Sequence, residues 1–460
     1  MNIISYLPKI EKYLVIFSLT AFFFFWGLKL GYFQARLLVF LPLLIIIYQT
    51  YKNRNYNFVK LPAIILGCLL IHLMAVKYFF GIFNFITIIY SIFLTFIAII
   101  LSYYKELILK NLYLIVNTFI FITPIIIFIN LYLALVLSAE NSSLPTIDLF
   151  INCDRSAISF GKFIFQENSH FSMMAVPVIL SFFFLKKKLL TNLNKIFFAV
   201  FLIINIIFFS TTLLVSLILC SLYFIFYLLI NNSIGFNLTK YDKLNNNLLS
   251  LNITFQKNFK KIIILFIVVI VSYGISVLPT CKKKIYETVY LITKVENEIS
   301  IANKNDQQTQ DKRYEVNSSS STFYYSLLVT LESLKKFNLI GVGINNYETA
   351  FNSVAEDLRW FIDKEGDRKI HDYAASVNKQ DGYNNFSKIL VEFGILSLLL
   401  IPVFLKFMFS NKVNLFHKVF FSSLVITQLL KGAGYFNGGF IVAILFILII
   451  IFDNDKINYS

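Results

Sequence analysis

Two neighbouring apolar runs decide the fold: LPAIILGCLLIHLMAVKYFF over residues 61–80 and IFNFITIIYSIFLTFIAIILSY over residues 82–103. The hydrocarbon core of a bilayer is about 30 Å thick, and a helix that rises about 1.5 Å per residue needs roughly 20 apolar residues to cross it. Lys77 is the only charged side chain in the two runs. The pair therefore predicts two membrane-spanning helices joined by a short turn.

Similar runs recur along the whole chain, which predicts an all-α polytopic membrane protein with about twelve spans. The ten further runs are 13–33, 37–50, 112–137, 171–185, 194–210, 212–231, 261–279, 386–409, 414–430 and 436–452. The composition agrees, because 58% of the 460 residues are hydrophobic and only 14% are charged. Soluble domains are about 45–50% apolar and about 25% charged, so this composition excludes a soluble enzyme and a disordered chain.

The formal charge of +16 is explained by membrane topology rather than by a nucleic-acid partner. With the N-terminus in the cytoplasm, the inside segments carry 20 basic residues and the short outside segments carry 6. Such a bias is what the positive-inside rule predicts. We therefore expect both termini in the cytoplasm and no nucleic-acid partner.

The spans divide the chain into five parts. Helices over 1–137 precede a first outside loop at 138–170, middle helices over 171–279 precede a large outside loop at 280–385, and the last helices occupy 386–460. The large loop has 14 basic and 15 acidic residues, and apolar residues between Phe323 and Phe337 at helical spacing predict a helix there.

Signatures of cytosolic nucleotide chemistry are absent from the sequence, as are His-Glu-x-x-His and Cys-x-x-Cys metal or redox motifs. We expect no cofactor and no metal. Cys153 and Cys281 fall in the two outside loops, where either a disulfide or two unpaired cysteines fit the pattern.

Two candidate constellations lie in the outside loops. Glu167, Ser169 and His170 form the first, at the entry to the sixth span, where a carboxylate and an imidazole could act as general base or bind hydroxyls. An interfacial helix cap is the alternative. The second is Gly341-Val342-Gly343, which could bring backbone amides close to an anion or form a plain turn between helices.

Two more constellations lie at the ends of late spans. Asn384-Asn385 could bind sugar hydroxyls, and Glu392, seven residues into the next span, indicates either a function or a buried partner. Lys431-Gly432-Ala433-Gly434-Tyr435 joins the last two spans. Lys431 sits where a cation could meet a lipid diphosphate, or could snorkel to the membrane surface.

In this order, the four constellations resemble those of the O-antigen polymerase (Wzy) family, related to the O-antigen ligases, over roughly residues 150–440. The chain departs from relatives in two places. Asn384-Asn385 stands where ligases commonly have His-Asn, and Lys431 stands where an arginine is common in relatives.

The resemblance implies a multi-pass protein of the bacterial inner membrane that makes a surface polysaccharide such as lipopolysaccharide O-antigen, capsule or exopolysaccharide. An acceptor hydroxyl would attack a glycan carried on undecaprenyl diphosphate, and the lipid diphosphate would leave. The partners implied are this lipid-linked oligosaccharide, membrane lipids, a chain-length regulator and a flippase. The protein's task would be to orient two substrates and to neutralise the leaving group.

Under this interpretation the site residues have three roles. Glu167 or His170 would act as base, with His371 as a further candidate, although His371 could equally lie on a solvated face. Arg155, Arg359, Arg368 and Lys431 would bind the diphosphate, since guanidinium groups contact it in a bidentate manner. Ser169, Asn384, Asn385 and Tyr435 would bind sugar. An O-antigen ligase, a flippase and a purely structural membrane protein are the alternatives.

Overall fold

The structure is a computed structural model. It describes residues 7–24, 29–30, 33–54, 56–140, 168–186, 189–207, 210–239, 262–275, 318–337, 339–355, 379–380, 382–432, 434–435 and 439–452. Of the site residues predicted above, Arg155, Glu167, Arg359, Arg368 and His371 lie outside these ranges, as do Cys153 and Cys281.

Almost every described element is a helix. The α-helices are α1 (Leu7–Phe24), α2 (Leu41–Asn53), α3 (Lys60–Phe80), α4 (Phe85–Tyr103), α5 (Lys105–Glu140), α7 (Asn168–Phe182), α8 (Asn192–Ile207), α9 (Thr211–Thr239), α12 (Ser318–Lys336), α13 (Tyr347–Ala355), α16 (Asn385–Phe393), α17 (Leu400–Phe409), α18 (Leu415–Leu430) and α19 (Phe440–Phe452). A helix over Ile262–Ile275 and 3-10 turns at Ala35–Phe40, Asn57–Val59 and Gly394–Leu399 complete them. Strands β1 (Lys29–Leu30) and β2 (Phe33–Gln34) form one short antiparallel hairpin.

The membrane-protein class predicted from the sequence is supported by the helices. Five are long and apolar enough to cross a bilayer, and six shorter apolar helices accompany them among the described residues. The five are Asn57–Phe80, Phe85–Tyr103, Lys105–Ile125, Thr211–Ile230 and Asn385–Phe409. The count of twelve spans and the orientation of the chain stay predictions.

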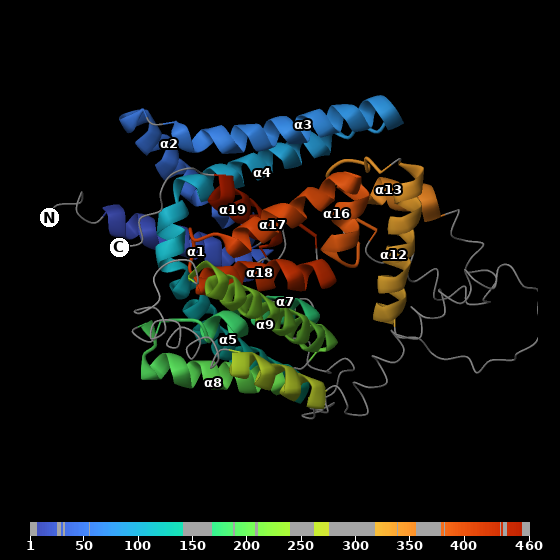
Figure 1. The fold of residues 1–460 in the computed structure, drawn as a ribbon. Coiled ribbons are helices and arrows are strands. Elements are labelled where there is room, and N and C mark those ends of the chain that lie inside the picture. The colour runs from blue at the N-terminus through green and yellow to red at the C-terminus, as the bar shows by residue number, and fades with distance from the viewer. Residues whose placement is uncertain are drawn as a thin grey trace, which may run out of the picture.

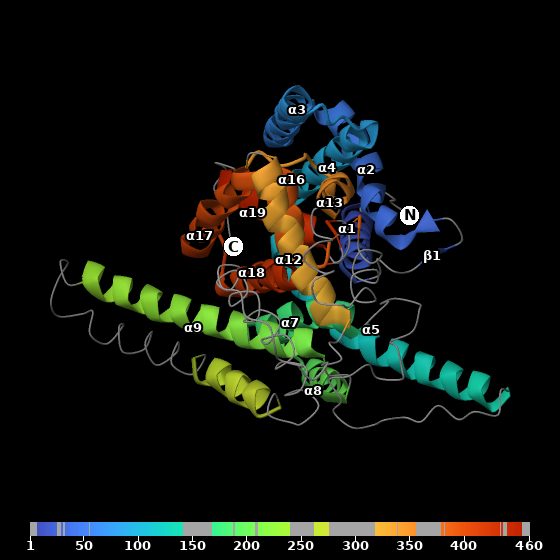
Figure 2. The same cartoon turned by 90° about the vertical axis from the view of Figure 1, so that its right-hand side faces the viewer.

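The bundle has two distinct ends (Figures 1 and 2). At one end, which we call the loop end, α12 lies across the bundle next to α13 and α16. The opposite end, which we call the terminal end, gathers the start of α1, the end of α4, the starts of α5 and α18 and the end of α19. Glu11 there accepts a hydrogen bond from Gln49, and Lys412 donates to the backbone oxygen of Ile450 at 3.3 Å.

The helix α18 lies at the centre of the packing, against α7, α9, α16 and α19. Its buried face includes Phe420 and Phe421, whose rings pack edge-to-face at 5.3 Å. By contrast α3 lies at the side of the bundle and is the least buried of the five long spans. Such an arrangement is expected when lipid rather than water covers the outer helices.

Local sequence explains where the helices begin and end. Asn84, Asn384 and Asn414 each stand at an N-cap, where the side-chain oxygen accepts a hydrogen bond from a backbone N–H of the first turn. Gly81 ends α3 in the left-handed conformation at φ 67°. The predicted helix between Phe323 and Phe337 is confirmed as α12, and the Gly341-Val342-Gly343 segment is a turn between α12 and α13, as expected.

Candidate functional site

Three of the four constellations meet at the loop end, beginning with the glycine segment and α16. The Val342 N–H donates to the backbone oxygen of Val391 at 3.0 Å, and the Gly343 N–H donates to that of Glu392 at 2.8 Å. In return the Ile395 N–H donates to the Leu339 oxygen at 2.7 Å. The break between α16 and α17 leaves backbone N–H and C=O groups without partners inside the helix, and these three bonds supply the partners. The glycine turn and the broken span are therefore held together by their backbones.

Glycine is required on both sides of this contact. Gly341 has φ +85°, and a Cβ there would lie 2.6 Å from the Glu392 oxygen. Gly394 has φ +55°, and a Cβ there would overlap the Leu339 oxygen. Any larger residue would separate the two backbones, which explains the Gly341 and Gly394 positions in the sequence.

A buried ion pair lies one turn before the break. The Lys388 ammonium is 3.2 Å from the Glu392 carboxylate, and the two side chains are 1% and 0% exposed. Lys388 also donates to the Gln380 oxygen at 2.8 Å, and its Nζ lies 5.7 Å and 5.2 Å from the ring centroids of Tyr347 and Tyr435. The lysine therefore joins α16 to α13, to the segment before α16 and to the segment after α18.

The two tyrosines surround the pair with hydroxyl groups. The Tyr435 hydroxyl interacts with the Glu392 carboxylate, and the Tyr347 hydroxyl lies 3.3 Å from Ser326 Oγ of α12. Burial raises the pKa of Tyr347 to about 12. Tyr347 is therefore neutral near pH 7 and serves as a hydrogen-bonding hydroxyl rather than as a base.

The segment after α18 covers the start of α16. A Cβ at Gly432 would lie 2.5 Å from Cγ of Asn385, and the Gly432 N–H points at the Tyr383 oxygen at 3.4 Å. Lys431 is half-buried, with its Nζ 3.7 Å from the centroid of the Tyr383 ring. The Asn384 side chain caps α16 by accepting from the Ser387 N–H at 2.7 Å, while the Asn385 amide is fully buried and makes no hydrogen bond within the described residues.

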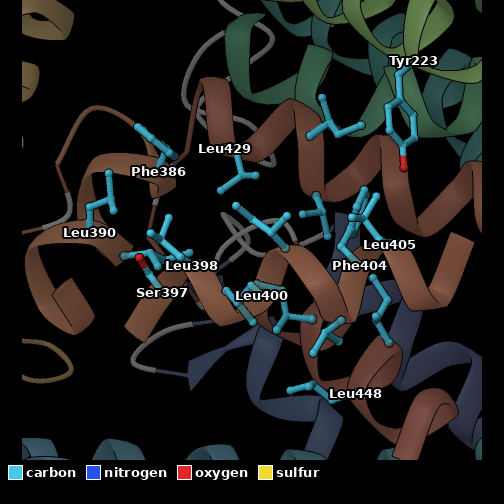
Figure 3. A pocket seen from close by; sticks show the side chains of 17 residues that line it. Tyr223, Phe386, Leu390, Ser397, Leu398, Leu400, Phe404, Leu405, Leu429 and Leu448 are labelled. Atoms are coloured by element: carbon cyan, nitrogen blue, oxygen red, sulfur yellow. The ribbon is translucent and has the colours of Figure 1, made fainter. Parts of the chain in front are cut away.

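An apolar groove of about 340 Å³ runs from this site along α17 and α18 (Figure 3). Phe386 and Leu429 line its end next to the site, and Tyr223, Leu405 and Leu448 line it further along. Lys431 follows Leu429 by two residues, and Tyr383 precedes Phe386 by three. The positively charged Lys431 therefore lies beyond the end of the groove that is next to the site. The groove itself suits a hydrocarbon chain.

The fourth constellation lies in α7. His170 is buried in the first turn of α7, Ser169 precedes it in the same helix, and α7 packs against α18. The structure thus places Lys431, Asn384, Asn385 and Tyr435 at one site and places His170 on a helix adjacent to α18.

Two residues of the site were not predicted from the sequence. Lys388 could have been found, since a lysine and a glutamate four residues apart in an apolar span lie on one helix face. His72 of α3 gave no such signal. Its Nε2 lies 3.1 Å from the Ile340 oxygen, and its ring stacks on Phe393 at 5.3 Å, which ties α3 to the glycine turn.

Across the described ranges, no group of three His, Cys, Asp or Glu side chains could hold a metal ion. No family model, curated protein or solved structure matches this chain. The function must therefore be argued from the arrangement of the site itself.

Proposed function

We propose that the chain polymerises oligosaccharide repeat units carried on a polyprenyl diphosphate, by glycosyl transfer at the loop end. The observation that carries this proposal is the meeting of Gly341-Val342-Gly343, Asn384-Asn385 with Glu392, and Lys431 with Tyr435 beside an apolar groove. These segments lie far apart in the sequence and form three of the four constellations on which the family resemblance rests. In this proposal the protein belongs to the bacterial inner membrane, with the loop end facing outward and both termini in the cytoplasm.

The groove and Lys431 suit the two parts of a lipid diphosphate. Hydrocarbon would lie against Phe386, Leu429 and the apolar side chains beyond them, and the diphosphate would lie at the membrane surface near Lys431. The ammonium of Lys431 has only a tyrosine ring as its partner among the described side chains, so it is able to contact an anion.

The reaction breaks the bond between the anomeric carbon and the lipid diphosphate and forms a glycosidic bond to an acceptor hydroxyl. The hydroxyl proton would pass to His170 or Glu167, with His371 as a further candidate base. The diphosphate leaves with its electron pair and would be neutralised by Lys431, Arg155, Arg359 and Arg368. Ser169, Asn384, Asn385 and Tyr435 would position the sugars, and we propose that no cofactor or metal takes part.

One observation favours a second function. A buried Lys388–Glu392 pair beside a break in a span is the kind of arrangement found in transporters, where broken helices expose backbone groups at a substrate site. The second candidate is accordingly a flippase for the same lipid-linked oligosaccharide. A ligase that transfers glycan to a lipid A core would use the same donor, and only its acceptor distinguishes it.

The test uses the purified full chain in proteoliposomes with a synthetic polyprenyl-diphosphate repeat unit. Polymerase activity gives a ladder of products longer by one repeat at each step, whereas a flippase only changes which leaflet holds the unit. We expect Lys431→Ala to slow ladder formation about tenfold or more, because a contact to the departing charge is lost. Lys335→Ala, on an exposed lysine of α12 that pairs with Glu332, is the control and should leave the ladder unchanged. Absence of any extended product from the wild-type protein would refute the proposal.

A further inference from the structure

A buried lysine at the terminal end has no carboxylate partner among the residues that the structure describes. Lys418 lies in the first turn of α18 and is 6% exposed. Its Nζ donates to the Tyr227 hydroxyl at 3.1 Å and lies 5.5 Å from the centroid of the same ring. Within the described ranges, no carboxylate forms an ion pair with Lys418, and Tyr227 is the one partner of its ammonium.

This arrangement is unfavourable for the protein alone. Transfer of an ammonium group out of water costs several kcal/mol unless a counter-charge and hydrogen bonds compensate it. Tyr227 supplies one hydrogen bond and a ring face, both of them neutral. Because an ammonium has three N–H donors, two remain for a further acceptor.

Two more lysines lie at the same end of the bundle. Lys412 lies just before α18 and donates to a backbone oxygen, and Lys406 at the end of α17 lies 5.5 Å from the ring centroid of Phe452. The N-terminus of α18 adds partial positive charge next to the same place. The neighbouring His417 contacts Asn414 and the Leu109 oxygen, and an imidazole carries no negative charge in either protonation state.

Apolar side chains open to the membrane lie beside these cations. Phe409 of α17 is 46% exposed, and its ring lies 5.8 Å from that of Tyr227. Phe452 is half exposed as well. A ligand that reaches Lys418 from this side therefore needs both an anionic group and hydrocarbon.

We propose that Lys418 and Tyr227 bind the phosphate of an anionic phospholipid at the terminal end of the bundle. The ammonium donates to a phosphate oxygen, and the Tyr227 hydroxyl, which accepts from Lys418, donates its own proton to the same group. The lipid chains pack against the exposed rings of Phe409 and Phe452. This site is separate from the loop-end site and does not depend on the proposed function.

The test is native mass spectrometry of the full chain released from nanodiscs of phosphatidylcholine with or without phosphatidylglycerol. The wild-type protein should retain one phosphatidylglycerol molecule. Lys418→Met should retain about tenfold less, since a charge-assisted bond to the phosphate is lost, and Lys418→Arg should retain as much as the wild type.

The control is Lys110→Met, which removes an exposed lysine near the same end that pairs with Glu106 at 3.7 Å. An equal loss in this variant would show diffuse attraction and overturn the proposal, as would unchanged retention in Lys418→Met. A parallel arm adds inorganic phosphate to phosphatidylcholine nanodiscs. If free phosphate raised the melting temperature of the wild type but not of Lys418→Met, and both proteins retained equal phosphatidylglycerol, the site would take a soluble anion and the proposal would be overturned.

Discussion

Lys388 and Lys418 are both buried, but they differ in what neutralises them. Lys388 at the loop end faces Glu392 across 3.2 Å and joins four segments of the chain. Among the described residues, Lys418 at the terminal end meets only a neutral tyrosine. The difference teaches that the loop-end charge is neutralised within the protein, whereas in our proposal a phospholipid supplies the counter-charge at the terminal end.

The largest effect should follow removal of one member of the loop-end pair. Glu392→Gln leaves the Lys388 charge buried without a counter-ion, and we expect the free energy of unfolding to fall by about 3–5 kcal/mol. Unfolding by SDS in mixed micelles measures this change. The double variant Lys388→Met with Glu392→Met should lose less than Glu392→Gln does, because no charge then stays buried.

The matched control for the pair is Glu332→Gln, which removes the exposed partner of Lys335 on α12. Exposed pairs contribute about 0–1 kcal/mol, so this variant should unfold almost as the wild type does. Equal losses in Glu392→Gln and in the double variant would show that charge neutralisation is not what holds the loop end together.

The next largest effect should come from the break between α16 and α17. Gly394→Ala places a methyl group on the Leu339 oxygen at φ +55°, and we expect about 2 kcal/mol of destabilisation or more. Gly67→Ala in α3 is the control, since a Cβ at Gly67 meets nothing within 4 Å. That variant should be stabilised by about 0.5–1 kcal/mol, as expected for alanine in a helix. A tolerated Gly394→Ala would contradict the close contact between the glycine turn and the broken span.

Lys418→Met should have a smaller effect of the opposite sign. Because the side chain has no carboxylate partner among the described residues, replacing it with a residue of similar length removes a desolvated charge. We expect the protein to be about 1 kcal/mol more stable in phosphatidylcholine. Thermal unfolding in nanodiscs provides the measurement. If Lys418→Met were destabilised as much as Glu392→Gln, Lys418 would have to be neutralised within the protein, as Lys388 is.

An effect of similar size, but confined to one contact, should follow His72→Phe, which keeps the ring on Phe393 but removes the contact to the Ile340 oxygen. The loss of one hydrogen bond should cost about 1 kcal/mol. Hydrogen exchange at residues 339–346 should rise in the variant while exchange in α18 stays constant. A uniform rise in both places would argue against a local contact between α3 and the glycine turn.

The sequence predicts the helical class well and the site only in part. Long apolar runs identify membrane helices because length and composition are local properties, and Asn384 before α16 has the cap geometry expected of its residue type. The glycines at 341 and 343 predict a turn, but its contact with Glu392 depends on chain segments about fifty residues apart. No local pattern encodes such a contact.

The two buried lysines show the same limit of prediction from sequence. Lys388 and Glu392 are four residues apart, so their pairing was accessible from spacing. From the sequence, Lys418 is one of the 20 basic residues of the inside segments, and its burial depends on α9, which brings Tyr227 against it. His72 meets Ile340 across most of the chain length and carried no signal in the sequence.

The most direct test asks on which side of the membrane each end lies, because the proposed function depends on it. Single cysteines at Asn352, exposed on α13, and at Lys110, exposed on α5, are introduced into a variant without native cysteines and treated with an impermeant thiol reagent. With the loop end outward, intact cells should label the Asn352 position, and the Lys110 position should react only after permeabilisation. The reverse pattern would place the proposed glycosyl-transfer site in the cytosol and contradict the proposed function.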